Sequence, residues 1–309
     1  SLQLQVRLAR SYTRRNKIAK FEGGWHGGYD ALHIGVKPPF DVPESAGLTA
    51  GALQDTIVLP FNDLEGVKKK LAGEDVASIT VEPVLGAGGC IPAEKEFLKG
   101  LRELCNKRDI LLIFDEVITG FRMAPGGAQE YYGVLPDLAV FGKILGGGFP
   151  IGAFCGSREV MARINTRLYE RPEHSFHGGT FAANPISMTA GLATLKQLED
   201  GRLLSELNKQ GEVARKKLKE CFEDGKIDVQ VTGDSSLFNI HFTRRKIRNA
   251  NDSVKTDKNM LFDYNLNLIV NGVFFLPGHN GALSTAHSKE DMEKLYHETE
   301  AYVTRLKEG

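Results

Sequence analysis

The chain has 309 residues, of which 41% are hydrophobic and 25% are charged, and its 39 basic residues balance its 39 acidic ones. This composition predicts a globular protein with a sizeable core and more than one domain. The zero net charge gives no indication of a nucleic-acid or membrane-surface partner. No apolar run approaches the roughly 18 residues of a membrane span, and no secretory signal is recognised. We therefore expect a cytoplasmic protein.

The cysteines also restrict the class of protein. There are four, they are scattered, and they form no CxxC pattern: Cys90, Cys105, Cys155 and Cys221. This spacing favours buried thiols in a reducing compartment over disulfides or a metal site. We expect no metal ligands.

The N-terminal part predicts an amphipathic helix over residues 1–16 and a short strand over 18–21. The strand leads into Glu22–Gly28, in which Trp25, the only tryptophan, and His26 are flanked by glycines. Glycines around an aromatic side chain allow a flat ligand to approach closely. The alternative interpretation is a core tryptophan near a turn.

Residues 29–56 are rich in proline, glycine and alanine and predict a long surface loop. A helix toward Leu71 and a strand over 76–81 follow. The strand runs into Glu82–Gly89, whose glycines fit neither GxGxxG nor GxxxxGK, so the segment is a weak phosphate-binding signal.

An amphipathic helix over 94–107 precedes a strand over 110–114, whose five apolar residues suit burial on both faces of a parallel sheet. Asp115 and Glu116 follow at its carboxyl end, where ligands bind in open α/β sheets. A carboxylate there could be a metal ligand, half of an acid/base pair, the partner of a pyridinium nitrogen, or a helix cap.

Residues 138–141 predict another buried strand, and Lys143 follows it before three glycines. A desolvated lysine with a lowered pKa can form a Schiff base with an aldehyde. By itself, Lys143 could equally extend from the strand end into solvent. Asp115 and Lys143 together favour pyridoxal phosphate, which needs a lysine for its aldehyde and an acid for its ring nitrogen.

The alternation of strands and helices up to a strand over 151–155 predicts a doubly wound, mostly parallel α/β sheet. Gly179 and Thr180 precede a helix over 185–198 and suit phosphate. A charged helix follows over 202–223. From residue 228 the pattern changes: residues 229–231 and 237–242 alternate like half-buried strands. Further strands are predicted over 273–276 and 283–286, and helices over 258–271 and from Ser288. We expect domains at 1–225 and 226–309, the second a smaller α+β unit.

Phe114–Arg122 (FDEVITGFR), together with Gly142–Lys143 and Gly146–Gly148, resembles the class III pyridoxal-phosphate aminotransferases. Within that class the chain is most similar to the glutamate-1-semialdehyde 2,1-aminomutase group. The resemblance covers essentially the whole chain. It implies a fold-type I pyridoxal-phosphate-dependent transferase, in which Lys143 is the Schiff-base and proton-transfer lysine.

The resemblance also implies roles for the other site residues. Asp115 pairs with the ring nitrogen of pyridoxal 5'-phosphate, Trp25 stacks on one ring face with His26 beside it, and Val117 packs on the other face. Thr180, with Gly179, reaches the phosphate of the neighbouring subunit's cofactor, which implies a homodimer with shared active sites. Glu82 and His279 are the candidate substrate residues.

The chain departs from the family pattern at three places. Ala87 stands where the aminomutases have asparagine, and His279 stands where they have glutamate. The Ser-Gly-Thr phosphate turn and the N-terminal segment before it are expected to be missing. Three functions stay open: an aminomutase reaction on a semialdehyde, transamination of another amine or amino acid with a separate keto-acid acceptor, or a catalytically impaired chain that binds only phosphate or cofactor.

Overall fold

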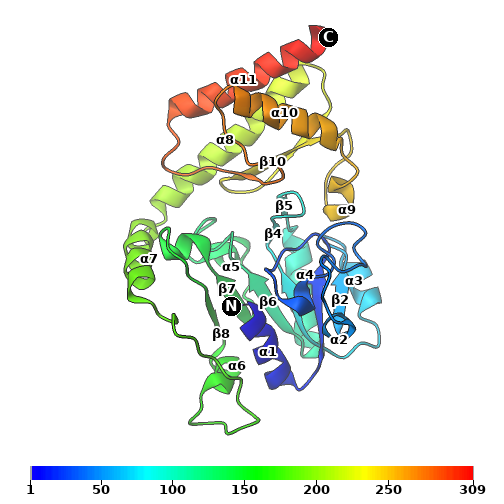
Figure 1. The fold of residues 1–309 in the computed structure, drawn as a ribbon, viewed down its shortest axis with the longest axis vertical. Helices are drawn as coiled ribbons and strands as arrows, with labels where there is room; N and C mark the ends of the chain where they lie inside the picture. Colours follow the sequence, from blue (N-terminus) through cyan, green and yellow to red (C-terminus); the bar gives the residue numbers. More distant parts are fainter. Residues whose placement is uncertain (1, 309) are drawn as a thin grey trace.

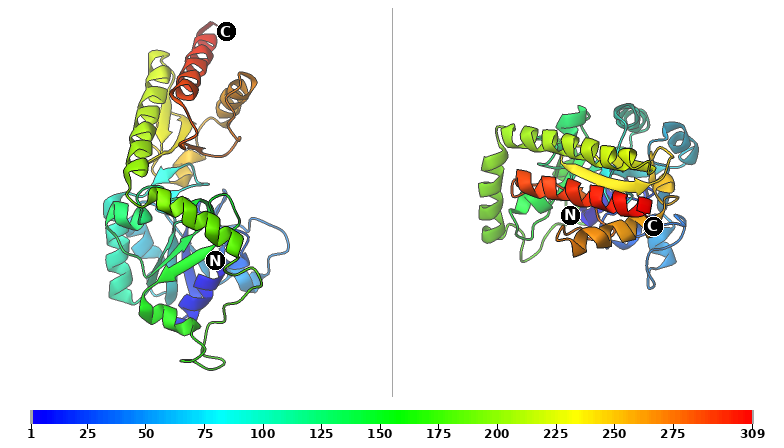
Figure 2. Two further views of the ribbon diagram at one scale, coloured as in Figure 1. Left: turned by 90° about the vertical axis from the view of Figure 1, so that its left-hand side faces the viewer. Right: turned by 90° about the horizontal axis from the view of Figure 1, so that it is seen from above.

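A computed structural model describes residues 2–308. Two units lie end to end in Figures 1 and 2, a larger one around a six-stranded sheet and a smaller one around a three-stranded sheet. The strands of the large sheet have the order β2-β1-β3-β6-β7-β8. They span β1 (Lys17–Phe21), β2 (Thr56–Leu59), β3 (Val76–Val81), β6 (Leu111–Asp115), β7 (Leu138–Phe141) and β8 (Ala153–Gly156).

Helices cover both faces of the large sheet, as buried strands require. On one face α3 (Leu64–Lys70) and α4 (Lys95–Arg108) bury Val67, Phe97 and Leu101 against the sheet. On the other face α1 (Leu2–Thr13) and α6 (Arg158–Met161) share a core with the sheet residues Ile113 and Val140. The remaining helical segments of this unit are η1 (Asp30–Leu32), α2 (Ala50–Leu53), α5 (Gly127–Tyr132), η2 (Lys143–Gly146), η3 (Ala162–Ile164) and α7 (Pro185–Leu198).

All strand pairs of this sheet are parallel except the last, in which β8 runs antiparallel to β7. The expected mostly parallel, doubly wound α/β sheet is therefore confirmed. The register aligns Lys20 of β1 with Thr80 of β3, and Asp115 of β6 with Val140 of β7. Parallel strands bring their carboxyl ends to one edge of the sheet, so the segments after β1, β3, β6 and β7 meet there.

The smaller unit contains an antiparallel sheet of β9 (Val229–Thr232), β10 (Leu237–Phe242) and β11 (Gly281–Ala282) in the order β11-β10-β9. Helices α8 (Arg202–Asp224), α10 (Lys258–Val270) and α11 (Lys289–Glu308) share its core, and α9 (Ala250–Ser253) is a short turn of helix. Helix α8 buries Leu218 and Phe222 in this core, although the predicted domains, 1–225 and 226–309, assign it to the large unit.

Hydrogen bonds connect the two units at the hairpin of β4 (Val84–Leu85) and β5 (Ile91–Pro92). The hydroxyl of Thr232 donates to the carbonyl of Gly89 at 2.7 Å, and Nε2 of His241 lies 3.0 Å from the same oxygen. Nearby, the guanidinium of Arg122 donates to the hydroxyl of Ser236 at 3.0 Å. These contacts fix the small unit against the edge of the large sheet where the strand ends meet.

Several local expectations were wrong. Residues 273–276 and 283–286 are not strands, and the strand of this region is the two-residue β11. The apolar run over 273–276 includes Phe274 and Leu276, which are exposed. Strand β2 lies inside the segment that was predicted to be a long loop, and the two-residue strands β4 and β5 are too short to show a period. Of the four cysteines, Cys155 is exposed rather than buried.

Among residues 2–308 no helix combines the length and apolar character needed to cross a bilayer. In the same part of the chain, no group of three or more His, Cys, Asp or Glu side chains is arranged to hold a metal ion.

The buried His241 predicts a pH-dependent stability. Burial lowers the pKa of His241 to about 4, whereas the unfolded chain holds it near its ordinary value. The unfolded state therefore takes up a proton first as the pH falls, and stability is lost between about pH 6.5 and pH 4. We expect this group to remove about 2 kcal/mol of unfolding free energy between pH 7 and pH 5.

Urea unfolding of the chain and of His241→Gln at both pH values measures this contribution. The variant should lose less stability than the unsubstituted chain on acidification. His297→Gln, at an exposed position of α11, is the matched control and should behave like the unsubstituted chain. An equal acid response of His241→Gln would contradict the assignment.

Candidate active site

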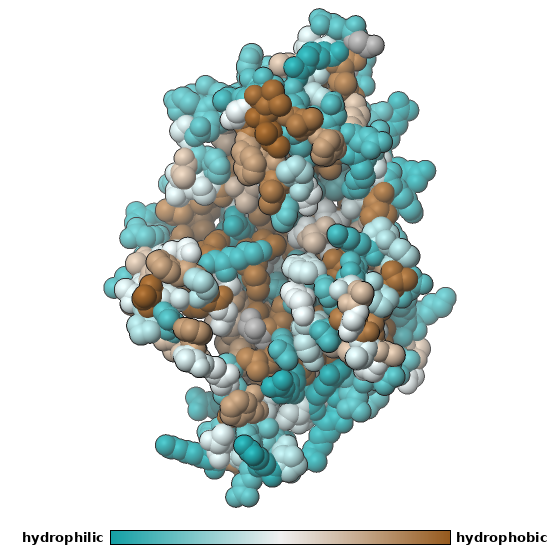
Figure 3. Space-filling view, viewed as in Figure 1, coloured by the Kyte–Doolittle hydropathy of each residue, from teal (hydrophilic) through white to brown (hydrophobic). Residues whose placement is uncertain are grey.

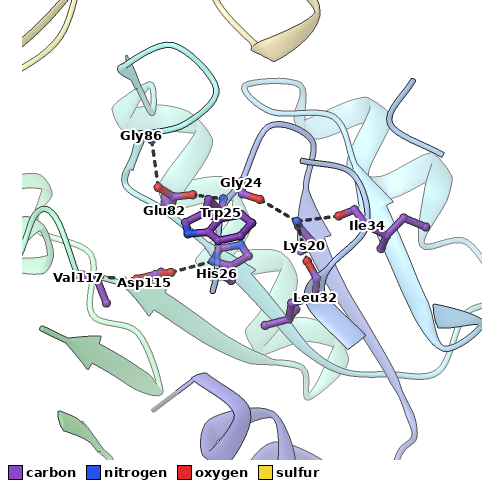
Figure 4. A network of polar contacts seen from close by, with 10 residues as sticks. All are labelled: Lys20, Gly24, Trp25, His26, Leu32, Ile34, Glu82, Gly86, Asp115 and Val117. Atoms are coloured by element: carbon purple, nitrogen blue, oxygen red, sulfur yellow. Dashed lines mark hydrogen bonds and ion pairs between the residues drawn. The ribbon is translucent and has the colours of Figure 1, made fainter. Parts of the chain in front are cut away.

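The candidate site is a cavity of about 1160 Å³ at the carboxyl ends of the parallel strands. The segments that follow β1, β3, β6 and β7 each contribute side chains, and the loop 277–280 of the small unit closes one side. Seven of the sequence-predicted residues line it: Trp25, His26, Glu82, Asp115, Val117, Lys143 and His279. Figure 4 shows how those contributed by the first three strand ends are connected.

Lys143 begins η2, directly after the end of β7, and its backbone has a left-handed φ of 46°. Such a conformation is strained for a side chain larger than glycine, and strain of this kind concentrates at functional sites. The turn is held by α7, where a Cβ on Gly191 would lie 2.3 Å from the carbonyl oxygen of Leu145. Although part of Lys143 is exposed, burial around its amine lowers its pKa, against the opposing effect of Glu82 and Asp115.

Asp115 is buried at the end of β6 and is held by two hydrogen bonds. Nδ1 of His26 lies 2.7 Å from Oδ2, and the backbone N–H of Val117 donates to Oδ1 at 3.2 Å. Burial lowers the pKa of His26, so we assign a neutral imidazole whose Nδ1–H donates to the carboxylate. A carboxylate has about four lone-pair sites, so Asp115 can accept a further hydrogen bond from a group in the cavity.

Glu116, the second carboxylate at this strand end, forms hydrogen bonds with α5 instead. It accepts hydrogen bonds from the backbone N–H groups of Ala128 at 2.6 Å and Gln129 at 3.2 Å. It also accepts the hydroxyl of Thr119 at 3.0 Å. These contacts hold the first turn of α5, so the helix-capping role that the sequence left open for Asp115 belongs to Glu116 instead.

Trp25 and Glu82 are connected in the wall of the cavity. The backbone N–H of Trp25 donates to Oε1 of Glu82 at 2.7 Å, and the N–H of Gly86 donates to Oε2 at 3.0 Å. Burial and the nearby charge of Asp115 raise the pKa of Glu82 to about 8. The indole of Trp25 is 47% exposed and packs edge-on against His33. Trp25 is thus not a core residue, because its ring borders the cavity.

The two departures from the family pattern lie on loops at the same cavity. Ala87 is exposed in the β4–β5 hairpin, and His279 is exposed in the loop 277–280. Asn280 ties these loops together by donating to the carbonyl of Gly86 at 3.1 Å. Both departures therefore face the part of the cavity that lies between the hairpin and the small unit.

Gly179 and Thr180 lie apart from this group. Both are exposed on the segment before α7, and neither belongs to the cavity lining found in the described chain. The structure of one chain thus does not bring them together with Lys143 and Asp115.

Sequence reasoning missed several residues at this site. Lys20 of β1 is fully buried beneath it, and the cavity lining also includes His33, Lys37, Glu44, Phe141 and Ile151. Lys20 left one signal, a charged residue inside the otherwise apolar run Ile18–Phe21. Of the others, His33, Lys37 and Glu44 come from the long loop after β1, Phe141 ends β7, and Ile151 lies before β8.

The side chains around this cavity are those that pyridoxal phosphate requires. A lysine amine and a buried carboxylate with spare acceptor capacity face one cavity, and a flat aromatic side chain borders it. The first turn of α1 lines the same cavity through Leu2 and Gln3, and helix N-termini attract phosphate groups. A parallel α/β sheet with this arrangement at its carboxyl edge defines the class of fold-type I pyridoxal-phosphate enzymes.

Comparisons with known proteins agree with this class and narrow it. The sequence model of the family "Aminotransferase class-III" matches residues 2–288, and the chain belongs to this family. It is 43% identical to the glutamate-1-semialdehyde 2,1-aminomutase of Methanothermobacter thermautotrophicus, over 98% of the chain and 72% of the relative. It is 41% identical to the enzyme of that name from Methanopyrus kandleri, over 97% of the chain and 70% of the relative.

Solved structures show the same fold. An omega-transaminase from Sphaerobacter thermophilus has a TM-score of 0.89 and 33% identity, covering 98% of this chain and 71% of that one. A glutamate-1-semialdehyde-aminomutase from Pseudomonas aeruginosa PAO1, in complex with PMP, has a TM-score of 0.86 and 26% identity, over 98% and 69% of the two chains. The protein is thus a pyridoxal-phosphate-dependent class III aminotransferase similar to the aminomutases.

Proposed function

We propose that the chain moves an amino group within a semialdehyde of an amino acid, as the name of its aminomutase relatives implies for them. The observation that carries this proposal is the convergence of Lys143, Asp115 and Trp25 on one cavity at the ends of adjacent parallel strands. Pyridoxal phosphate supplies an aldehyde for the substrate amine and a protonated ring that accepts electron density from the reacting carbon.

The residues of the chain then have distinct tasks. The Nζ amine of Lys143, with its lowered pKa, is suited to take a proton from the substrate carbon and return it as a general acid/base. The Asp115 carboxylate would accept the N–H of the ring nitrogen, and His26 fixes the orientation of that carboxylate. Trp25 and Val117, which both line the cavity, would contact the two faces of a flat ring, and the first described turn of α1, which also lines it, would hold the phosphate.

Glu82 and His279 are proposed to contact the substrate. Glu82 has a pKa raised to about 8, so at neutral pH it is largely protonated and can donate a hydrogen bond into the cavity. His279 enters from the small unit, opposite the strand ends. We propose that the protein is cytoplasmic. The active site is proposed to lie in the predicted domain 1–225, at its junction with the domain 226–309.

A homodimer is the proposed assembly. The segment with Gly179 and Thr180 leads into α7, which exposes apolar side chains where a water-facing helix would be polar. Figure 3 shows apolar residues on the part of the surface where α7 lies. The exposed fractions are 82% for Phe181, 62% for Ile186, 50% for Met188 and 56% for Leu192. Pairing of two copies over this face would cover it and bring Thr180 toward the partner's cavity.

A second candidate function is transamination of another amine or amino acid with a separate keto-acid acceptor. Ala87 and His279 favour it, because neither has the side chain that the aminomutase pattern places there. The 33% identity to an omega-transaminase agrees with this alternative. The third possibility, a chain that binds only phosphate or cofactor, is tested by the same experiments.

The first prediction concerns Lys143. Adding pyridoxal phosphate to the purified chain should produce the visible absorbance of lysine-bound cofactor, and Lys143→Ala should lose it, because Lys143 follows the strand beside Asp115, whereas Lys37, another lysine of the described lining, lies on the loop after β1. Borohydride reduction followed by peptide mass spectrometry should place the label on Lys143. Lys107→Ala, at an exposed position of α4, is the control. A label on another lysine would overturn the assignment.

The second prediction separates the two reactions. An aminomutase returns the amino group to the same carbon skeleton, so glutamate-1-semialdehyde alone should be converted to its amino-shifted isomer without an added acceptor. Lys143→Ala should lower this rate by at least about a hundredfold, within the range for loss of a general acid/base. Turnover that requires a separate keto acid would support the transaminase, and cofactor binding without turnover of either kind would support the impaired chain.

The third prediction concerns the assembly. Sedimentation velocity should show a dimer, and Leu192→Glu should weaken it by roughly 100-fold or more, because it places an unpaired charge in an apolar interface. Leu135→Glu changes an equally apolar side chain that is 73% exposed before β7, and this control should leave the assembly unchanged. A monomer in both the unsubstituted chain and the variants would refute the dimer.

A further inference from the structure

Lys20 is a lysine with no exposed surface, on the strand β1 beneath the candidate site. Its Nζ donates to the backbone carbonyl oxygens of Gly24 at 2.7 Å, Leu32 at 3.1 Å and Ile34 at 2.7 Å. An ammonium has three donors and no acceptor, so these three carbonyls use its full hydrogen-bonding capacity. Figure 4 shows the amine at the centre of this set.

The three carbonyls belong to one segment, which leaves the end of β1 and returns over it. Gly24 lies at the exit, directly before Trp25 and His26, and Leu32 and Ile34 lie on the return. The amine therefore joins the beginning of the segment to its end. Between Gly24 and Leu32 the chain contains η1 but no strand. The backbone of 24–32 therefore depends on hydrogen bonds such as those from Lys20.

The charge of Lys20 is compensated by its surroundings. Burial lowers its pKa to about 8, while Glu82, Glu44 and Asp115 act in the opposite direction and favour the ammonium. The relation is mutual, because Lys20 also lowers the pKa of Glu82 and of His26. Lys20 is thus electrically coupled to the groups that line the cavity, although it does not line the cavity itself.

We propose that Lys20 is a positioning residue of the active site, which fixes Trp25 and His26 by closing the segment 24–34. Through the backbone of Gly24 it sets where the Trp25 ring and the Trp25 N–H bond to Glu82 lie. Through the same segment it holds His26 against Asp115. The proposal rests on the proposed function for the statement that these side chains serve a cofactor, but the closing of the segment is independent of it.

If the Lys20 side chain only filled space in the core, its three hydrogen bonds to carbonyl oxygens would not be needed. Methionine has about the volume of the lysine stem and would fill the same space, yet it would leave three carbonyls without a donor. Unpartnered buried polar groups are costly, so the segment would shift to let these carbonyls reach water. Trp25 and His26 would move with it.

The unique tryptophan makes the proposal measurable, because intrinsic tryptophan fluorescence reports on Trp25 alone. Lys20→Met should shift the emission of the folded chain and increase its quenching by acrylamide. It should also raise the dissociation constant for pyridoxal phosphate by about tenfold, as expected for lost hydrogen bonds to a charged group. Lys70→Met is the matched control, since Nζ of Lys70 donates to the Val58 carbonyl at 2.8 Å from the exposed surface.

The result that would overturn the proposal is a folded Lys20→Met chain with unchanged Trp25 emission and quenching, whatever its urea stability. If that variant does not fold, Lys20→Gln retains two donors and should show an intermediate change in quenching, while unchanged quenching would again overturn the proposal. A shifted Trp25 signal in a chain that binds no pyridoxal phosphate in any form would uphold the positioning role and refute the proposed function instead.

Discussion

The parallel pairing of β1, β3, β6 and β7 is the constraint on which the site depends. Neighbouring strands lie about 4.8 Å apart, so four strand ends in this order bring their next residues within reach of one small ligand. Trp25 follows β1, Glu82 follows β3, Asp115 ends β6 and Lys143 follows β7. The distance along the chain between these residues therefore has no influence on their distance in space.

The titratable side chains gathered at this edge can be buried only because each has polar partners. Lys20, His26, Glu82 and Asp115 are all buried, and each would be costly to bury alone. In combination, the His26 imidazole donates to Asp115, Glu82 holds two backbone N–H groups, and the Lys20 amine is surrounded by carbonyls. The hydrogen bonds thus offset the cost of burying these groups, and they connect the groups to the backbone around the cavity.

The cavity has two sides of different origin. The side with Asp115, Val117 and Lys143 is built on strand ends that the core holds in place. The side with Ala87 and His279 is built on a hairpin and a loop, joined by the bond from Asn280 to Gly86. Loops accommodate changes that a packed sheet does not. This division explains how a chain can keep the cofactor chemistry of its family and still depart from it where a substrate would lie.

The sequence by itself determined the strands of the large sheet except β2, and it identified two polar residues at strand ends as candidates for the chemistry. Buried parallel strands are continuous apolar runs, and a polar residue that ends such a run, as Asp115 and Lys143 do, is visible without coordinates. The family resemblance supplied the roles expected of Trp25, His26 and Val117.

Only the tertiary structure decided which residues support the site. Glu116 looks equivalent to Asp115 in the sequence, but it turns to cap α5. Lys20 gives little sign of its task, because its three partners are backbone carbonyls, which every residue has. The two-residue strands and the packing of α8 on the small unit were likewise hidden. Such features arise from contacts between segments that are distant along the chain, and local pattern does not record them.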